Sequence, residues 1–174
     1  ETVRALAERG HNFKVTLPTV PHVAPLIADA VADWPVQPQI VQEEAEKWAA
    51  FGKADAALAA SGTVSLELAL SGVPLISCYR PDRLAMALMH RFITSWSASL
   101  PNLIADWPVV PEFYNEFVRP AYLARLIEQL WNDTTARAAQ LDGFRQIAER
   151  MTTARPSGEL AATAILDLIA DRKN

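Results

Sequence analysis

The turn Ser61-Gly62-Thr63 combines residue types that could bind a phosphate group. It follows a run of small apolar residues, 56–60, that is typical of a buried strand, and leucines at helical spacing come after it. At the start of a helix the first backbone N–H groups are free and the dipole is positive, and Gly62 lets the backbone approach a ligand closely. The turn therefore suits a diphosphate, although from the tripeptide alone an ordinary serine N-cap is the favoured interpretation.

Glu67 is the next residue whose position could carry chemistry. It lies four residues after Thr63, on the same face of the expected helix, and its carboxylate could accept two hydroxyl groups of a ribose. Its neighbours Leu66 and Leu68 are apolar, so a charge here is costly unless it is paired. The alternative is a surface glutamate whose carboxylate stays in water, and the spacing alone does not decide between the two.

Other chemistries have less support in the residue pattern. The histidines His11, His22 and His90 are far apart and have no cysteine or carboxylate at ligand spacing, so we expect no metal site. Cys78 falls inside an expected strand, which favours a core position over a nucleophile. The chain contains neither Gly-x-Gly-x-x-Gly nor Gly-x-x-x-x-Gly-Lys-Ser/Thr, which argues against a dinucleotide cofactor and against a nucleoside triphosphatase. We expect no cofactor.

The composition is that of an ordinary globular protein, with 51% hydrophobic and 21% charged residues. A net charge of −4 argues against a nucleic-acid partner. The single cysteine excludes an internal disulfide and fits a reducing compartment, and no apolar run is long enough to cross a bilayer. The chain begins with Glu1 inside a helical pattern, so we expect its natural N-terminus to lie upstream.

Glycines, prolines and the apolar periodicity divide the chain into alternating elements. Helices are predicted over residues 2–9, 21–33, 43–53, between the 61–63 turn and Ser71-Gly72, over 82–96, and over 120–172 in three pieces with breaks near 132–133 and 155–158. Strands are predicted over 12–17, 38–42, 56–60, 75–79 and 98–105, and residues 106–116 are predicted to be a loop. On the second helix the residues predicted to face inward are Val23, Leu26, Ile27, Ala30 and Val31.

This order predicts an α/β fold with a Rossmann-like, doubly wound parallel sheet. Right-handed crossovers place the carboxyl ends of the strands at one edge, where ligands of such sheets bind. The 61–63 turn, Tyr79-Arg80 and Asn102 all follow predicted strand ends and should meet there. The helix over residues 82–96 has a wide apolar face that is predicted to pack on the sheet; contact with acyl chains or a membrane is the alternative.

Three ordered motifs carry a resemblance to a known family. They are Ala-Ser-Gly-Thr-x-x-Leu-Glu, Pro-Leu-Ile-x-x-Tyr-Arg and Ser-Leu-Pro-Asn-Leu-Ile-Ala, and with them the chain strongly resembles the lipid-A-disaccharide synthases. The resemblance covers nearly the whole chain but only the C-terminal half of the family's architecture. It implies an inverting glycosyltransferase of the GT-B fold, in which two Rossmann-like domains face each other. The C-terminal domain would hold the donor, UDP-2,3-diacylglucosamine, and the N-terminal domain the acceptor, 2,3-diacylglucosamine 1-phosphate.

The same resemblance implies a set of residues that bind the UDP-sugar: Ser61, Gly62, Thr63, Glu67, Arg80, Asn102, Glu112 and Asn115. Residues 61–63 are similar to the family's diphosphate turn, and Glu67 to the carboxylate that binds the uridine ribose. Asn102 matches an asparagine that is expected to face the donor. Arg80 is expected to add positive potential for the leaving diphosphate.

The segment that contains Glu112 and Asn115 departs from the family pattern. Pro111-Glu112 and Asn115 resemble a Pro-Glu-x-x-Gln segment in which Asn115 replaces the usual glutamine. Asp106 stands where a glycine is common. The assignment of the family's residue roles to this chain therefore has its weakest support in the 107–115 loop.

Two parts of the family's architecture are missing from the chain. One is the N-terminal domain, in which the catalytic base is expected, so the catalytic residues are unknown. The other is the first strand of the C-terminal domain with its Gly-Ser-Arg turn, which belongs between the strands at 12–17 and 56–60. We therefore expect one partial nucleotide-sugar-binding domain over residues 1–174, with C-terminal helices from about 120, whose sheet lacks its middle strand.

The implied partners are UDP-2,3-diacylglucosamine, the lipid acceptor and the cytoplasmic face of the inner membrane, to which the protein would be peripheral; a homodimer is one further assembly to test. Two other functions stay open. One is a different GT-B transferase that uses another UDP-sugar, such as the glycosyltransferase of peptidoglycan lipid synthesis. The other is a UDP-binding fragment without catalysis. A Rossmann-like module that binds no nucleotide is the least specific alternative.

Overall fold

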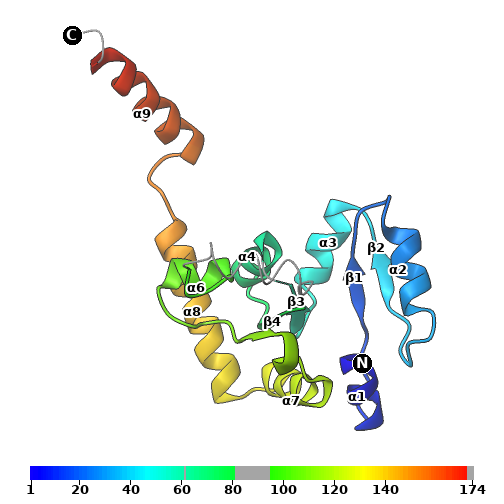
Figure 1. Ribbon diagram of the computed structural model, residues 1–174. Coiled ribbons are helices and arrows are strands. Elements are labelled where there is room, and N and C mark those ends of the chain that lie inside the picture. The colour runs from blue at the N-terminus through cyan, green and yellow to red at the C-terminus, as the bar shows by residue number, and fades with distance from the viewer. Residues whose placement is uncertain (61, 81–94, 172–174) are drawn as a thin grey trace.

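The computed structural model describes residues 1–60, 62–80 and 95–171. Their helices are α1 (Thr2–Glu8), α2 (Ala24–Val31), α3 (Glu44–Phe51), α4 (Thr63–Leu70), α6 (Leu100–Ala105), α7 (Pro120–Trp131), α8 (Thr135–Met151) and α9 (Ser157–Asp171), with the 3-10 turn η1 (Asn115–Phe117) (Figure 1). Their strands are β1 (Thr16–Pro18), β2 (Gln39–Val41), β3 (Ala57–Ala59), β4 (Leu75–Tyr79) and β5 (Glu112–Tyr114).

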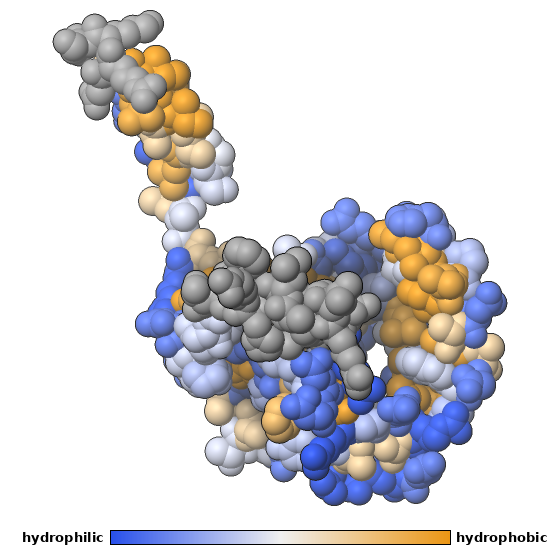
Figure 2. All heavy atoms as spheres, viewed as in Figure 1, coloured by the Kyte–Doolittle hydropathy of each residue, from blue (hydrophilic) through white to orange (hydrophobic). Residues whose placement is uncertain are grey.

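All the strand pairs in the described ranges are parallel, and they form two sheets instead of one. β1 pairs with β2, and β3, β4 and β5 pair in that order. The sheets separate between β1 and β3, which is the place where a missing strand is expected from the sequence. Figure 2 shows an opening in the surface between the part that carries β1, α2 and β2 and the rest of the molecule. The parallel α/β class is confirmed, as is a sheet interrupted at this point.

Two predicted elements are wrong. The strand predicted over residues 98–105 is instead α6, because Pro101 suits a first helical turn and Asn102 and Ala105 are buried on one side of the helix. The loop predicted over 106–116 contains β5. A strand of three residues is too short to show an alternating pattern, and it is specified by its pairing with β4.

The predicted burial also needs correction at two elements. β3 is not a fully buried strand: Leu58 is 42% exposed and Ala60 is exposed, because β4 is the only strand paired with β3 in the described ranges. On α2, Leu26 is 70% exposed and Ala30 is also exposed, so the inward face is narrower than predicted. β1 is shorter than the predicted strand over 12–17.

The predicted helix over residues 82–96 can be checked only at its end. Residues 82–94 lie outside the described ranges, and residues 95–96 are not helical. The helical region after residue 120 has its breaks near the predicted positions, since α7 ends at Trp131 and α9 begins at Ser157.

The core lies on both faces of the three-stranded sheet. Successive residues of β4 face opposite sides, so Leu75 joins a cluster with α4 and α8 while Ile76 joins a second cluster with α1 and α7. Both side chains are completely buried. Burial on both faces explains why β4 begins with two adjacent large apolar residues, and its predicted bounds are correct.

We expect Gly143→Ala to destabilise the fold, because α8 approaches the 107–109 segment closely at this glycine. A Cβ atom at Gly143 would lie 2.6 Å from Cγ1 of Val109 and 3.2 Å from Cζ2 of Trp107. Overpacking of this kind costs about 1–3 kcal/mol, which offsets the roughly 1 kcal/mol that alanine gains over glycine inside a helix. Urea unfolding measures the difference. Gly158→Ala is the matched control, since its added Cβ meets nothing within 4 Å. Equal effects of the two variants would contradict the close approach.

α9 projects away from the rest of the molecule, and its surface is rich in hydrophobic residues (Figure 2). Its large apolar residues are exposed: Ile165, Leu166, Leu168 and Ile169. Among the described residues, no helix combines the length and hydropathy that a membrane span requires.

Candidate nucleotide-sugar site

The carboxyl ends of β3, β4 and β5 bring three of the predicted site segments to one edge of the sheet. Thr63 follows β3, Arg80 follows β4 and Asn115 follows β5, and the three strands are adjacent and parallel. Ser61 lies outside the described residues. Loops beyond the carboxyl ends of parallel strands are the usual place for ligands in such sheets.

The turn between β3 and α4 has the backbone geometry that a close ligand approach requires. Gly62 is the N-cap of α4 and has a φ of 138°, a conformation that favours glycine. The Ser65 hydroxyl donates a hydrogen bond of 2.6 Å to the Gly62 carbonyl, which stabilises the turn from inside. Thr63 is exposed, and the Ser65 N–H donates to the Gly62 carbonyl at 3.3 Å, so the amides at the very start of a helix such as α4, those of Thr63 and Val64, are the ones that an intrahelical bond does not use. The turn can therefore present N–H groups to an anion.

The carboxylate of Glu67 has a specific partner. The ammonium group of Lys47 lies 3.1 Å from Oε2, and the two side chains are 25% and 33% exposed. Lys47 is on α3, which follows the carboxyl end of β2, while Glu67 is on α4. The partner that the sequence requires for a charged Glu67 thus comes from another helix. Sequence reasoning missed Lys47, because the two residues are 20 positions apart and no local pattern pairs them.

Asn102 is at a different place from the one predicted. It does not follow a strand; it lies in α6 with 1% of its surface exposed. Its amide nitrogen donates to the Val110 carbonyl at 2.9 Å and to Glu112 Oε2 at 3.2 Å, and its oxygen accepts from the Val110 N–H at 2.7 Å. These bonds attach α6 to the backbone that leads into β5. A contact between Asn102 and a donor sugar stays a prediction.

Glu112 is the centre of a hydrogen-bond network. Besides Asn102, its carboxylate accepts from the Ser97 hydroxyl at 2.5 Å, the Ala98 N–H at 3.3 Å and the Tyr114 hydroxyl at 2.5 Å. Four donors converge on one half-buried carboxylate and hold residues 97–102 against β5. Tyr114 is two residues from Glu112 on β5 and shares its face of the strand, whereas the sequence carries no signal for Ser97, which is 15 positions away.

Arg80 and Asn115 are at the edge that the sequence predicts for them. The exposed Arg80 donates from Nη2 to the Val118 carbonyl at 2.6 Å, which places its guanidinium beside the segment that follows β5. Asn115 has a φ of 50°. Asparagine adopts this left-handed conformation more readily than glutamine, which gives a physical reason for the departure from the family's glutamine.

The shifted pKa values belong to groups outside this edge. Arg9 donates two hydrogen bonds to Glu128 and thereby lowers the pKa of that carboxyl group, to which His11 also bonds at 2.5 Å. This cluster attaches the end of α1 to α7. Burial raises the pKa of the Cys78 thiol, which agrees with a core position in β4. In the described part of the chain, no three His, Cys, Asp or Glu side chains are grouped as a metal site requires.

Comparison with known proteins identifies the family to which the chain with this site is similar. Residues 1–165 match the family model described as lipid-A-disaccharide synthetase. A lipid-A-disaccharide synthase of Bradyrhizobium diazoefficiens is 40% identical over 161 residues, which are 92% of this chain and 41% of the relative. A Rhodopseudomonas palustris synthase is 41% identical and a Rhodospirillum centenum synthase 40% identical, over 97% and 98% of this chain and 43% of each relative. The chain therefore spans less than half the length of the relatives that it matches.

Proposed function

Since this chain belongs to the lipid-A-disaccharide synthase family, we propose that it forms the donor-binding region of an inverting glycosyltransferase in lipid A biosynthesis. The proposed reaction joins UDP-2,3-diacylglucosamine to 2,3-diacylglucosamine 1-phosphate and releases lipid A disaccharide 1-phosphate and UDP. The observation that carries the proposal is the Gly62 turn at the start of α4, which shares a sheet edge with Arg80 and Asn115.

In the proposed complex, the donor diphosphate lies against the amino end of α4. The amides after Gly62, the hydroxyls of Ser61 and Thr63, and the dipole of the helix favour an anion there. Glu67 is one turn further along α4, where its carboxylate can accept the ribose hydroxyls. Glu112 and Asn102 hold the neighbouring segment on β5 and complete the donor side, together with Asn115.

The proposed chemistry is displacement at the anomeric carbon. The 6-hydroxyl oxygen of the acceptor forms a bond to that carbon while the bond to the UDP oxygen breaks, and the configuration inverts. A base must take the hydroxyl proton, and we assign it to a part of the protein other than this chain. The residues at this edge act on the leaving group, because the α4 amides and Arg80 stabilise the charge that develops on the diphosphate.

The proposed substrates also indicate where the protein works. Both carry acyl chains, so the reaction would take place at a membrane surface, and we place it at the cytoplasmic face of the inner membrane. A homodimer is part of this proposal. Sedimentation of the protein with vesicles and analytical ultracentrifugation test these two points.

We expect Glu67→Ala to weaken UDP binding by about 1–3 kcal/mol, because a charged acceptor for the ribose hydroxyls is lost. Calorimetric titration with UDP should use this chain by itself and also joined to the upstream part of the Bradyrhizobium synthase that the chain does not cover. Glu149→Ala, an exposed change on α8, is the control and should leave the affinity unchanged.

Two results would overturn the proposal. In one, neither preparation binds UDP. In the other, a structure with UDP places the diphosphate away from the amino end of α4. An unchanged affinity of Glu67→Ala would overturn only the ribose contact.

A further inference from the structure

We propose that Lys47 is a positioning residue of the ribose subsite: it holds the Glu67 carboxylate in the orientation that accepts the ribose hydroxyls. The inference rests on the proposed donor-binding function and names a residue on a different helix from the one that carries the subsite. It follows from the contact between Lys47 Nζ and Glu67 Oε2, which are 3.1 Å apart.

The contact uses only one of the two carboxylate oxygens. Oε2 receives the lysine, while Oε1 has no hydrogen-bond partner among the residues that the structure describes. An ionised carboxylate has about four acceptor positions over its two oxygens. Glu67 can therefore keep its bond to Lys47 and still accept two hydroxyl groups, so binding a ribose does not require that the ion pair break.

Lys47 is itself fixed by its surroundings. Its ammonium group lies 4.4 Å from the centroid of the Trp48 ring, and that ring packs edge-on against Phe51 at 5.5 Å. Phe51 belongs to the buried core. A cation held over an aromatic face and bonded to a carboxylate loses much of its freedom before any ligand arrives. The fixed ammonium group in turn restricts the Glu67 side chain through their contact. The Glu67 side chain therefore loses less conformational entropy when a ribose binds.

The position of the pair agrees with a ligand role. α3 and α4 begin just after the carboxyl ends of β2 and β3, and Glu67 lies one turn beyond Thr63, the residue at the start of the helix that follows the diphosphate turn. An ion pair whose two side chains are 25% and 33% exposed contributes little to the stability of a fold. Loss of Lys47 should therefore have little effect on unfolding and a clear effect on ribose recognition, which separates the two roles.

The test compares two ligands that differ only in the ribose hydroxyls, UDP and 2′,3′-dideoxyuridine diphosphate. Calorimetry is carried out on the full chain, by itself and joined to the upstream part of the Bradyrhizobium synthase. For Lys47→Met we expect UDP affinity to fall roughly 3- to 10-fold, with little change for the dideoxy ligand, since one ordered acceptor contributes about 0.5–1.5 kcal/mol. Lys47→Arg should restore most of the preference for UDP. Lys53→Met removes an exposed lysine close to the end of α3 and should change neither affinity.

A double variant checks that Lys47 acts through Glu67. If it does, Lys47→Met should cause no further loss of UDP affinity in a Glu67→Ala background. Equal losses for UDP and the dideoxy ligand would overturn the inference, because Lys47 would then act on the diphosphate or on the fold. So would additive losses in the double variant. If Glu67→Ala by itself leaves the preference for UDP unchanged, the proposed contact between Glu67 and the ribose is contradicted. The inference about Lys47 depends on that contact and is then contradicted as well.

Discussion

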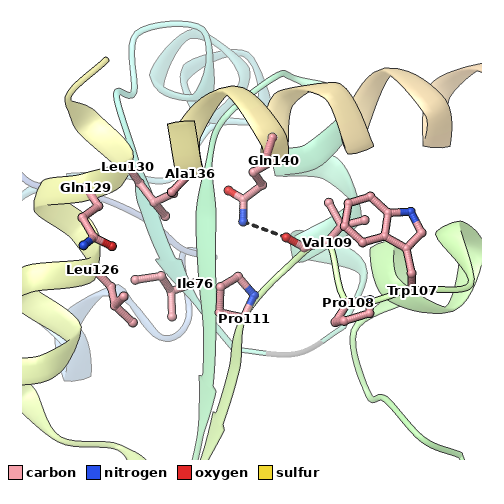
Figure 3. A pocket seen from close by; sticks show the side chains of 11 residues that line it. Ile76, Trp107, Pro108, Val109, Pro111, Leu126, Gln129, Leu130, Ala136 and Gln140 are labelled. Atoms are coloured by element: carbon pink, nitrogen blue, oxygen red, sulfur yellow. Dashed lines mark hydrogen bonds between the residues drawn. The ribbon is translucent and has the colours of Figure 1, made fainter. Parts of the chain in front are cut away.

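Gln140→Ala is expected to lower the free energy of unfolding by about 2–4 kcal/mol, one of the largest effects of any single polar substitution in this chain. Gln140 is on α8 and is 4% exposed. Its side-chain oxygen accepts from the Leu75 N–H at 2.7 Å, and its nitrogen donates to the carbonyls of Leu75 at 3.0 Å and Val109 at 3.1 Å. Figure 3 shows the bond to Val109.

The size of the effect follows from the groups that the substitution leaves behind. Truncation at Gln140 leaves one N–H and two C=O groups without their partner in the interior, at about 1–3 kcal/mol for each unsatisfied group. An adjoining cavity of about 180 Å³, lined largely by apolar residues of α7, α8 and β4 such as Ile76 and Leu130, can admit a water molecule that replaces part of the lost bonding (Figure 3). The expected cost is therefore below the sum of three separate penalties.

The experiment is chemical unfolding of the chain in urea, followed by circular dichroism. Gln146→Ala is the matched control, because Gln146 is an exposed glutamine of the same helix whose side chain donates to the exposed Asp142 carboxylate at 2.9 Å. Gln140→Glu is a second variant: it keeps the size but loses the two N–H donors and should be at least as destabilising as alanine. Equal midpoints for Gln140→Ala and Gln146→Ala would show that the buried bonds to Leu75 and Val109 do not hold α8 on the sheet.

Asn102→Ala is expected to have a comparable effect, about 2–4 kcal/mol of unfolding free energy, through the segment that enters β5. The side chain bonds to both the N–H and the C=O of Val110, and its loss leaves these two buried groups unsatisfied. It also removes one of the four donors on Glu112. Asn102→Asp should be at least as harmful, because it loses both donated bonds and places a second carboxylate beside Glu112.

Urea unfolding and a UDP titration of the same preparations measure this result. Asn132→Ala is the control, since the Asn132 amide donates to a single carbonyl, that of Glu128, in an exposed position. Wild-type stability of Asn102→Ala would contradict the structural role that the bonds assign to this residue. A loss of UDP affinity in a preparation that is still folded would support the predicted role of Asn102 toward the donor.

Sequence signals that act over a few residues were sufficient to predict several elements of this fold. The bounds of β4 and the start of α4 after the Ser61-Gly62-Thr63 turn follow from apolar runs, glycines and prolines that act within a few residues. The same local order of motifs identified the family, and the family implied a sheet interrupted between β1 and β3, as found.

Contacts between distant residues decided the rest. Residues 100–105 form a helix and residues 112–114 a strand because Asn102, Val110 and β4 lie together in space, which no period along the chain records. The partner of Glu67, and three of the four donors to Glu112, likewise come from other parts of the chain. The sequence alone determined the order of the motifs from which a nucleotide-sugar site is predicted. The tertiary structure decided which side chains the residues of these motifs contact, because hydrogen bonds and ion pairs such as Lys47 with Glu67 depend on packing between elements and not on spacing.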